Sequence, residues 1–367
     1  MKIASRMNAI DSSGIRKVFD LGQKLKDPVN LSIGQPDYDV PVEVKSAAVR
    51  SIFEGKNKYT VTQGIPELRE KIKAHIEKEK QCSLEDIMIT SGVSGSILLA
   101  FLSMLDAGDE LIVPDPYFVM YKHLSRLIGA VPIYLPLEKD FSYDVGKLES
   151  LITPKTRMIV LNSPSNPTGV INTSSELKAI AKIAQKYGLL VISDEIYDSF
   201  VYEKEYESIA RYYPETLVIG GFSKSHAMTG WRVGYAAGPG TLIREMIKIQ
   251  QYTFVCSPSF AQYSALTALD CDTTHYKEDY RRKRDLIYNG IKDAFAVRKP
   301  DGAFYIFPKA PGGVGSKFAE KAVENNLLII PGNVFSEHDT HVRISFAAPD
   351  ETIVRGIEIL NKLAAQY

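Results

Sequence analysis

The chain has 367 residues, of which 45% are hydrophobic and 24% are charged, and its 44 basic residues balance its 44 acidic residues. This length favours two packed lobes over a single hydrophobic core. A net charge of zero creates no field that attracts polyanions, so neither nucleic acid nor a membrane surface is an expected partner. The apolar stretches are too short to span a bilayer and the N-terminus lacks a signal-like apolar core, so we expect a cytoplasmic protein.

The first two thirds of the chain alternate short apolar runs with longer helical patterns. Such alternation predicts an α/β fold with a mostly parallel sheet covered by helices on both faces. We predict strands at residues 86–90, 111–113, 158–161, 189–192 and 217–219, and helices at 96–105 and 173–187. Thr173 and Glu176 have the spacing of a capping box, which predicts the start of the second helix.

The pattern changes after residue 270. A long charged helix is predicted at 277–296, alternating strands at 302–307 and 342–346, and a final helix at 350–363. We therefore expect a large domain over residues 31–270 and a smaller α+β domain over 271–367. Residues 1–30 are expected to form an N-terminal segment that packs with the smaller domain. The cysteines, Cys82, Cys256 and Cys271, are far apart without a CxxC pair, so we expect reduced thiols and no metal site.

Polar residues follow four of the predicted strands. Ligands of such sheets bind beyond the carboxyl ends of the strands, so these residues are expected to meet at one sheet edge. The four groups are Thr90 to Gly95, Asn162 to Asn166, Asp194 to Tyr197, and Ser223 with Lys224.

Three of these groups have side chains or backbone suited to chemistry. A lysine just past a buried strand, Lys224, is a candidate nucleophile because desolvation lowers its pKa, although surface lysines are far more common. Asp194 at a buried strand end needs a partner; it could bind a metal, cap a helix or pair with a protonated ring nitrogen. The small residues from Thr90 to Gly95 precede an apolar helix whose N-terminus favours an anion such as phosphate, which is a weak signal by itself. Tyr197, Asn166 and Arg232 each also have an ordinary structural reading, as a core, turn and surface residue.

Taken together, these segments resemble the class I/II pyridoxal-phosphate-dependent aminotransferases of fold type I. The motifs that carry the resemblance are 163–169 (SPSNPTG), 193–197 (SDEIY) and 223–235 (SKSHAMTGWRVGY). Supporting matches are 31–37 (LSIGQPD), Tyr59 before 64–69 (GIPELR), and 343–346 (RISF). They follow the family's order and span nearly the whole chain.

The resemblance implies a role for each matching position around pyridoxal phosphate. Lys224 would carry the cofactor as a Schiff base and then move the substrate proton, and Asp194 would keep the pyridine nitrogen protonated. Tyr197 and Asn166 would bind the phenolic oxygen, and Phe118 would stack on the ring. The phosphate would be bound by Val93, Ser94, Ser223 and Arg232, and by Tyr59 from the neighbouring subunit, which implies a homodimer with shared sites.

The same resemblance implies how substrate binds. Arg343 would hold the α-carboxylate of the substrate, as guanidinium geometry allows, with Gly34, Phe118 and Asn166 beside it. The substrate side chain would lie near the N-terminal segment, around Ile15. Ser94 stands where several aspartate-preferring relatives carry lysine, which weakens a strict aspartate preference and leaves aromatic, alanine-like, kynurenine-like or broad donors open.

We therefore expect transfer of an amino group between an L-amino acid and a 2-oxo acid, with formation of the pyridoxamine form of the cofactor. The alternatives are a C–S β-lyase or a cyclopropane-forming lyase on the same scaffold, and a non-catalytic regulatory or binding protein. Intact Lys224, Asp194 and Arg343 argue against the last. A nicotinamide dehydrogenase is disfavoured because no GxGxxG motif follows a strand.

Overall fold

The computed structural model describes residues 1–22 and 25–367, and its largest element is a sheet of seven strands. The strand order is β2-β8-β7-β6-β5-β3-β4. The strands are β2 (Asp86–Thr90), β3 (Glu110–Asp115), β4 (Val131–Pro136), β5 (Thr156–Asn162), β6 (Leu190–Asp194), β7 (Thr216–Gly221) and β8 (Gly234–Gly238). Only β8 runs antiparallel to its neighbours in this sheet, so β2 points the same way as the other strands. The predicted α/β fold with a mostly parallel sheet is confirmed.

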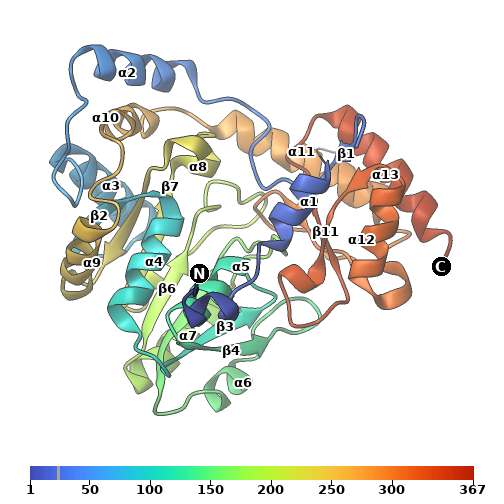
Figure 1. The fold of residues 1–367 in the computed structure, drawn as a ribbon, viewed down its shortest axis with the longest axis horizontal. Coiled ribbons are helices and arrows are strands. Elements are labelled where there is room, and N and C mark those ends of the chain that lie inside the picture. Colours follow the sequence, from blue (N-terminus) through green and yellow to red (C-terminus); the bar gives the residue numbers. More distant parts are fainter. Residues whose placement is uncertain (23–24) are drawn as a thin grey trace.

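Helices cover both faces of this sheet (Figure 1). Successive residues of a strand point to opposite faces, so Leu111 and Val113 of β3 enter one core cluster and Ile112 enters another. The first face is covered by α4 (Gly92–Met104), α5 (Val119–Leu127) and α9 (Gly240–Tyr252). The opposite face is covered by α3 (Pro66–Lys80), α6 (Val145–Ser150), α7 (Ser174–Tyr187) and α10 (Ser259–Ala268). The capping box of α7 is present as predicted.

The C-terminal part forms a second, smaller layer of sheet and helices. Its antiparallel strands lie in the order β11-β12-β9. The elements are β9 (Tyr305–Ile306), β11 (Ile330–Pro331), β12 (Val342–Ser345), α11 (Thr274–Ile291), α12 (Gly315–Glu324) and α13 (Asp350–Ala364). The N-terminal part joins this layer, because β1 (Val29–Asn30) pairs with β10 (Leu327–Leu328) and α1 (Gly14–Gly22) contacts β11. Two further elements are α2 (Val42–Phe53), which packs on α10, and the 3-10 helix η1 (Ser5–Ala9).

Three predicted elements differ from the structure by three or more residues at one or both ends, whereas the ends of the others agree within two residues. The helix predicted at 96–105 begins at Gly92, so Val93 and Ser94 lie in its first turn. The helix predicted at 277–296 spans Thr274–Ile291. The strand predicted at 302–307 is limited to Tyr305–Ile306, because the amides of Gly302 and Ala303 bond to the carbonyls of Gly169 and Phe200 instead of a neighbouring strand. Among the helices of the described residues, none has both the length and the apolar character needed to cross a bilayer.

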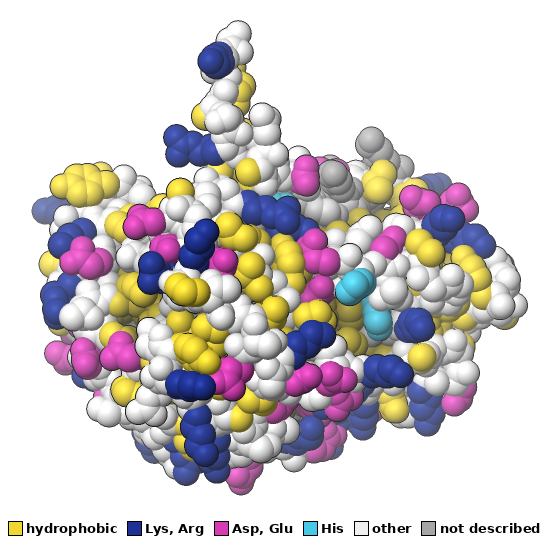
Figure 2. Space-filling model, turned by 90° about the horizontal axis from the view of Figure 1, so that it is seen from below, with side chains coloured by type: hydrophobic (Ala, Val, Ile, Leu, Met, Phe, Trp, Pro, Cys, Tyr) yellow, Lys and Arg dark blue, Asp and Glu magenta, His cyan; other side chains and the backbone are white. Residues whose placement is uncertain are grey.

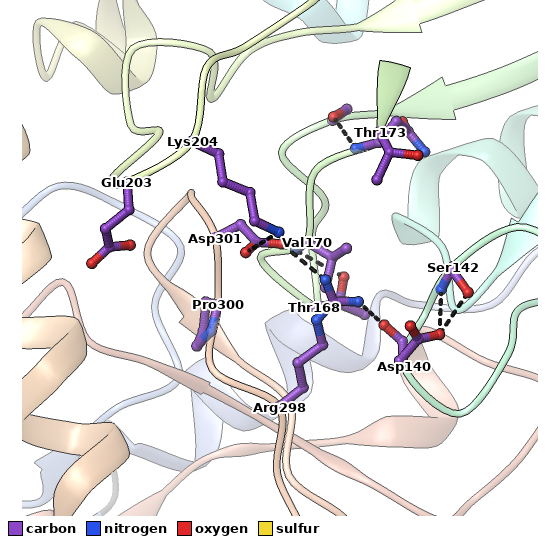
Figure 3. Close-up of polar contacts among 12 residues, drawn as sticks. Asp140, Ser142, Thr168, Val170, Thr173, Glu203, Lys204, Arg298, Pro300 and Asp301 are labelled. Carbon is purple, nitrogen blue, oxygen red and sulfur yellow. Dashed lines mark hydrogen bonds and ion pairs between the residues drawn. The ribbon is translucent and has the colours of Figure 1, made fainter. Parts of the chain in front are cut away.

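Polar contacts hold the segment between α11 and β9 against the part of the chain that forms the seven-stranded sheet (Figure 3). Arg298 donates to the Asp140 carbonyl and to Asp301 Oδ2 (3.1 Å), while Lys204 Nζ pairs with Asp301 Oδ1 (2.8 Å). In the same region, the Gly169 carbonyl accepts a hydrogen bond from the backbone amide of Asp301 (2.9 Å). Gly169 has φ +69°, and a Cβ there would lie 2.6 Å from Pro300 Cβ, so a side chain at this position would separate the two segments. The turn after β5 is thereby held next to β9.

Candidate active site

A cavity of about 280 Å³ lies beyond the carboxyl ends of β2, β5, β6 and β7. The predicted site residues that line it are Gly34, Val93, Ser94, Phe118, Asn166, Asp194, Tyr197, Ser223, Lys224, Arg232 and Arg343. Ile15 of α1 also lines it. The four polar groups that follow the strands are therefore together at one edge, joined by Arg343 from β12.

One predicted site residue lies elsewhere. Tyr59 is 83% exposed on the connection between α2 and α3, where it borders a separate hollow with Lys56 and Tyr263. Its implied role is toward a neighbouring subunit, so this position within one chain neither supports nor contradicts that role.

Lys224 extends into the cavity from α8 (Phe222–Ser225), the short helix that follows β7. Its Nζ donates to the Gly34 carbonyl at 2.5 Å. Burial lowers the pKa of Lys224 to about 8, and the positive charges of Arg343 and Arg232 add to this effect. A lysine with such a pKa has a substantial neutral fraction near pH 8, which is the form that can attack a carbonyl.

Asp194 lies at the end of β6 and is only 2% exposed. Oδ2 accepts from the Tyr121 hydroxyl (2.6 Å) and Oδ1 accepts from the Ile196 amide (3.3 Å). Burial raises the pKa of Asp194 to about 6, although both hydrogen bonds oppose this. Within the described residues the carboxylate has no ion-pair partner, so a cationic group in the cavity would stabilise its charged form. Tyr121 was not predicted as a site residue.

Arg343 is 1% exposed, a costly position for a charged group. Its Nη1 donates to Asn166 Oδ1 (3.0 Å) and its Nη2 donates to the Ser32 carbonyl (2.7 Å). The rings of Tyr305 and Phe335 lie 4.5 and 4.6 Å from its guanidinium carbon. No carboxylate within the described part of the chain pairs with it, and its buried Nε has no hydrogen-bond partner there. A guanidinium held in this way is prepared to bind an anion that enters the cavity.

Two further residues brace this group: Asn162, which belongs to one of the predicted polar strand ends, and Tyr305, which was not predicted as a site residue. The side-chain Nδ2 of Asn162 donates to the Asp194 carbonyl (3.0 Å), and its Oδ1 accepts from the backbone amide of Asn166 (2.8 Å). The hydroxyls of Tyr197 and Tyr305 are 2.9 Å apart. Asn162 thus connects the strand ends that carry Asp194 and Asn166, and Tyr305 connects Tyr197 with Arg343.

The first turn of α4 forms the anion-binding end of the cavity. Its N-cap residue Ser91 makes no side-chain capping bond, so the first amides of this 13-residue helix are available to an anion. Arg232 donates from Nη1 to the Thr229 carbonyl (3.0 Å) and from Nη2 to the Ser91 carbonyl (3.1 Å), which places its charge beside that turn. Val93, Ser94 and Ser223 line the same cavity.

These residues fit pyridoxal phosphate. The α4 amides and Arg232 would bind its phosphate. The unpaired carboxylate of Asp194 would pair with its protonated ring nitrogen, and the amine of Lys224 would attack its aldehyde. The guanidinium of Arg343 is left for the carboxylate of a substrate.

Comparisons with known proteins agree with this chemistry. The profile of the family described as "Aminotransferase class I and II" matches residues 26–360. The chain is 40% identical to a probable aspartate aminotransferase of Methanocaldococcus jannaschii, over 98% of this chain and 99% of that protein. It is 34% identical to aromatic-amino-acid aminotransferase 2 of Thermococcus litoralis, over 99% and 98%. The solved structure of Thermus thermophilus aspartate aminotransferase with maleate superposes with a TM-score of 0.96 at 33% identity, over 99% of this chain and 100% of that one.

Proposed function

This chain belongs to the class I and II aminotransferases, and we propose that the residues around Lys224 and Asp194 bind its cofactor. It is a pyridoxal-phosphate-dependent enzyme that transfers an amino group between an amino acid and a 2-oxo acid. The names of its relatives support amino-group transfer and not the alternative C–S β-lyase. The observation that carries the assignment of the site is the buried Lys224 amine, with its lowered pKa, in one cavity with Asp194 and Arg343.

When bound, pyridoxal phosphate supplies an electron sink for negative charge at the α-carbon of the substrate. Asp194 holds the ring nitrogen in its protonated form, because the ion pair compensates the buried carboxylate. Lys224 in its neutral form would accept the proton from the α-carbon, and its ammonium would then donate that proton at the C4′ position of the cofactor. Tyr197 and Asn166, which line the same cavity, would donate to the phenolic oxygen, and Phe118 would pack against the ring.

The remaining residues bind the two charged ends of the ligands. The α4 amides of Val93 and Ser94, with Ser223 and Arg232, hold the phosphate. Arg343 binds the substrate α-carboxylate, and the Gly34 carbonyl lies beside the Lys224 amine. Because Arg343 lies on β12 and Lys224 follows β7, the reacting atoms are held between the two parts of the chain.

The donor class is indicated by a second hollow of about 500 Å³ next to the cavity. The two hollows share Ile15, Gly34, Ser94 and Phe118. About half of the side chains that line the second hollow are apolar, among them Ile33, Val119, Met120 and Leu124, and apolar atoms supply most of its exposed surface. Its arginine, Arg16, pairs with Asp20 (3.1 Å). We therefore infer that the enzyme prefers amino donors with a large apolar or aromatic side chain.

A comparison of donors tests this preference. Phenylalanine and leucine should have kcat/KM values at least about tenfold above that of aspartate, since burying such a side chain stabilises binding by about 1.5–3 kcal/mol. Met120→Arg should reverse the order by adding a cation to the second hollow. Alanine is the control donor, because its methyl group is too short to fill the second hollow and its kcat/KM should stay within about twofold. A higher kcat/KM for aspartate in the unaltered enzyme would contradict the proposal.

We also propose that the enzyme is a homodimer with shared active sites. Large apolar and aromatic side chains are exposed on α2, on the following connection and at the end of α9, among them Phe53 (86%), Tyr59 and Tyr252. The first nine residues are exposed along their whole length, and Figure 2 shows a narrow arm that projects from the body. Exposed apolar groups of this size are typical of surfaces that bind a partner. A second copy would cover them and bring its Tyr59 toward the phosphate.

Two measurements test this arrangement: the oligomeric state in solution, and cofactor binding after removal of the Tyr59 hydroxyl. Sedimentation equilibrium should give about twice the chain mass of 40.8 kDa. Tyr59→Phe should weaken pyridoxal phosphate binding about tenfold, since a hydrogen bond to a charged group contributes about 1.5–3 kcal/mol. Tyr367→Phe, on an exposed tyrosine outside this surface, is the control. A monomer that binds the cofactor with unchanged affinity after Tyr59→Phe would disprove the shared site.

A further inference from the structure

A buried ammonium lies behind the turn that carries Asp194 and Tyr197. Lys80, the last residue of α3, has a side chain that is only 5% exposed. Its Nζ lies 2.5 Å from Glu195 Oε2 and 2.6 Å from Asp198 Oδ2. Burial opposes the charge of Lys80, but Asp198 and Glu195 together raise its pKa well above the usual value, so it is a cation in the folded protein.

The turn presents some of its residues to the cavity and others to the opposite side. Asp194 and Tyr197 line the active-site cavity, whereas Glu195 and Asp198 contact Lys80 on the other side. Glu195 is also held by the hydroxyls of Ser193 (2.7 Å) and Ser208 (2.5 Å). A single ammonium therefore holds both the residue that follows Asp194 and the residue that follows Tyr197.

Charge is coupled across the same turn. The negative charge of Glu195 adds to burial in raising the pKa of Asp194, while Tyr121 and Lys224 act in the opposite direction. On the far side, one cation faces two carboxylates, so the group has a net charge of about −1. Cys82, Tyr206 and Tyr235 also lie around this group. The hollow that Lys80 and Asp198 line is bordered by further titratable side chains, namely His75, Glu79, Glu205, Glu207 and Arg211.

We propose that Lys80 is a positioning residue that orients the turn from Asp194 to Asp198 and sets the electrostatic potential at the cofactor ring through Glu195. Removing the ammonium uncovers negative charge behind the ring, and removing the Glu195 charge has the opposite effect. A negative potential stabilises the protonated form of every group in the cavity. The proposal rests on the proposed role of Asp194.

The test is the pH midpoint of the absorbance change of the bound cofactor, measured with no substrate. In Lys80→Met the midpoint should rise by about 0.5–1 pH unit, and in Glu195→Gln it should fall by a similar amount. The double variant and Lys80→Arg should lie near the unaltered enzyme. Lys78→Met, on an exposed lysine (83%) of the same helix, is the matched control and should leave the midpoint unchanged.

A purely structural role for Lys80 predicts a different pattern. Loosening of the turn would shift the pH midpoint of both single variants in the same direction, or would leave both midpoints unchanged. Such a result would overturn the proposal. If Lys80→Met does not fold, Glu195→Gln still decides: a lower midpoint, with Lys80→Arg and Lys78→Met near the unaltered enzyme, supports the proposal, and an unchanged or higher midpoint overturns it. Asp194→Asn distinguishes failure of the proposed role of Asp194 from failure of the proposed role of Lys80. Full activity in that variant rejects the role of Asp194. Loss of activity in that variant, with the wrong order of midpoints in the Lys80 and Glu195 variants, rejects only the role of Lys80.

Discussion

Turnover should fall by about six orders of magnitude when Lys224 is replaced by alanine, the size of loss seen when an enzyme loses its nucleophile. Lys224 is the lysine whose amine extends into the active-site cavity, and its neighbours there are cationic or neutral apart from Asp194. Without it, neither covalent attachment of the cofactor nor proton transfer at the α-carbon has a basic group. The measurement is kcat with a donor and an oxo acid, together with the absorbance of the bound cofactor.

Lys248→Ala is the matched control, because that lysine is exposed on α9, where it pairs with Glu245. It should keep full activity. The pH dependence gives a second check on Lys224. Its pKa of about 8 lies below the ordinary lysine value, so capture of pyridoxal phosphate by the apoenzyme should accelerate as pH rises and level off above about 8. A rate that continued to rise toward pH 10 would mean that the amine is not desolvated.

The large sheet and the meeting of its polar strand ends could be predicted from local patterns. Buried parallel strands are continuous apolar runs, and β6 has such a run, so the position of Asp194 at a strand end is visible in the sequence. The same reasoning located Lys224 after β7. Arg343 could be assigned to the site only through the family resemblance, because β12 reaches the cavity from the other part of the chain.

Tyr121 and Tyr305 were missed because nothing in their local sequence pattern distinguishes them from core residues. Tyr121 lies on α5 among other aromatic and apolar residues, and only the packing of α5 on the sheet brings its hydroxyl to Asp194. Tyr305 depends in the same way on the contact of β9 with Tyr197 in the turn after β6. The Lys80 ion pair joins residues more than 100 positions apart, a separation at which sequence periodicity carries no information.

Replacing Asp194 with asparagine should lower kcat by about two to four orders of magnitude while the KM for the amino donor changes little. Asparagine has the same shape and can still accept from Tyr121, so the variant removes the charge and leaves the packing. A buried charge that loses its partner costs about 3–5 kcal/mol, and each 1.4 kcal/mol corresponds to a factor of ten in rate. Arg343, which binds the donor carboxylate, is untouched, and this is why the loss should appear in kcat.

Tyr121→Phe provides a graded comparison at the same carboxylate. It removes the hydrogen bond that lowers the pKa of Asp194, so the pKa should rise further above 6 and a smaller fraction of the carboxylate should be charged near neutral pH. Activity should therefore fall by about tenfold, and the loss should be larger at pH 6 than at pH 8, because raising the pH restores the charged form. A loss independent of pH would show that Tyr121 acts through packing alone. A mild effect of Asp194→Asn would mean that the Asp194 carboxylate only stabilises the turn after β6.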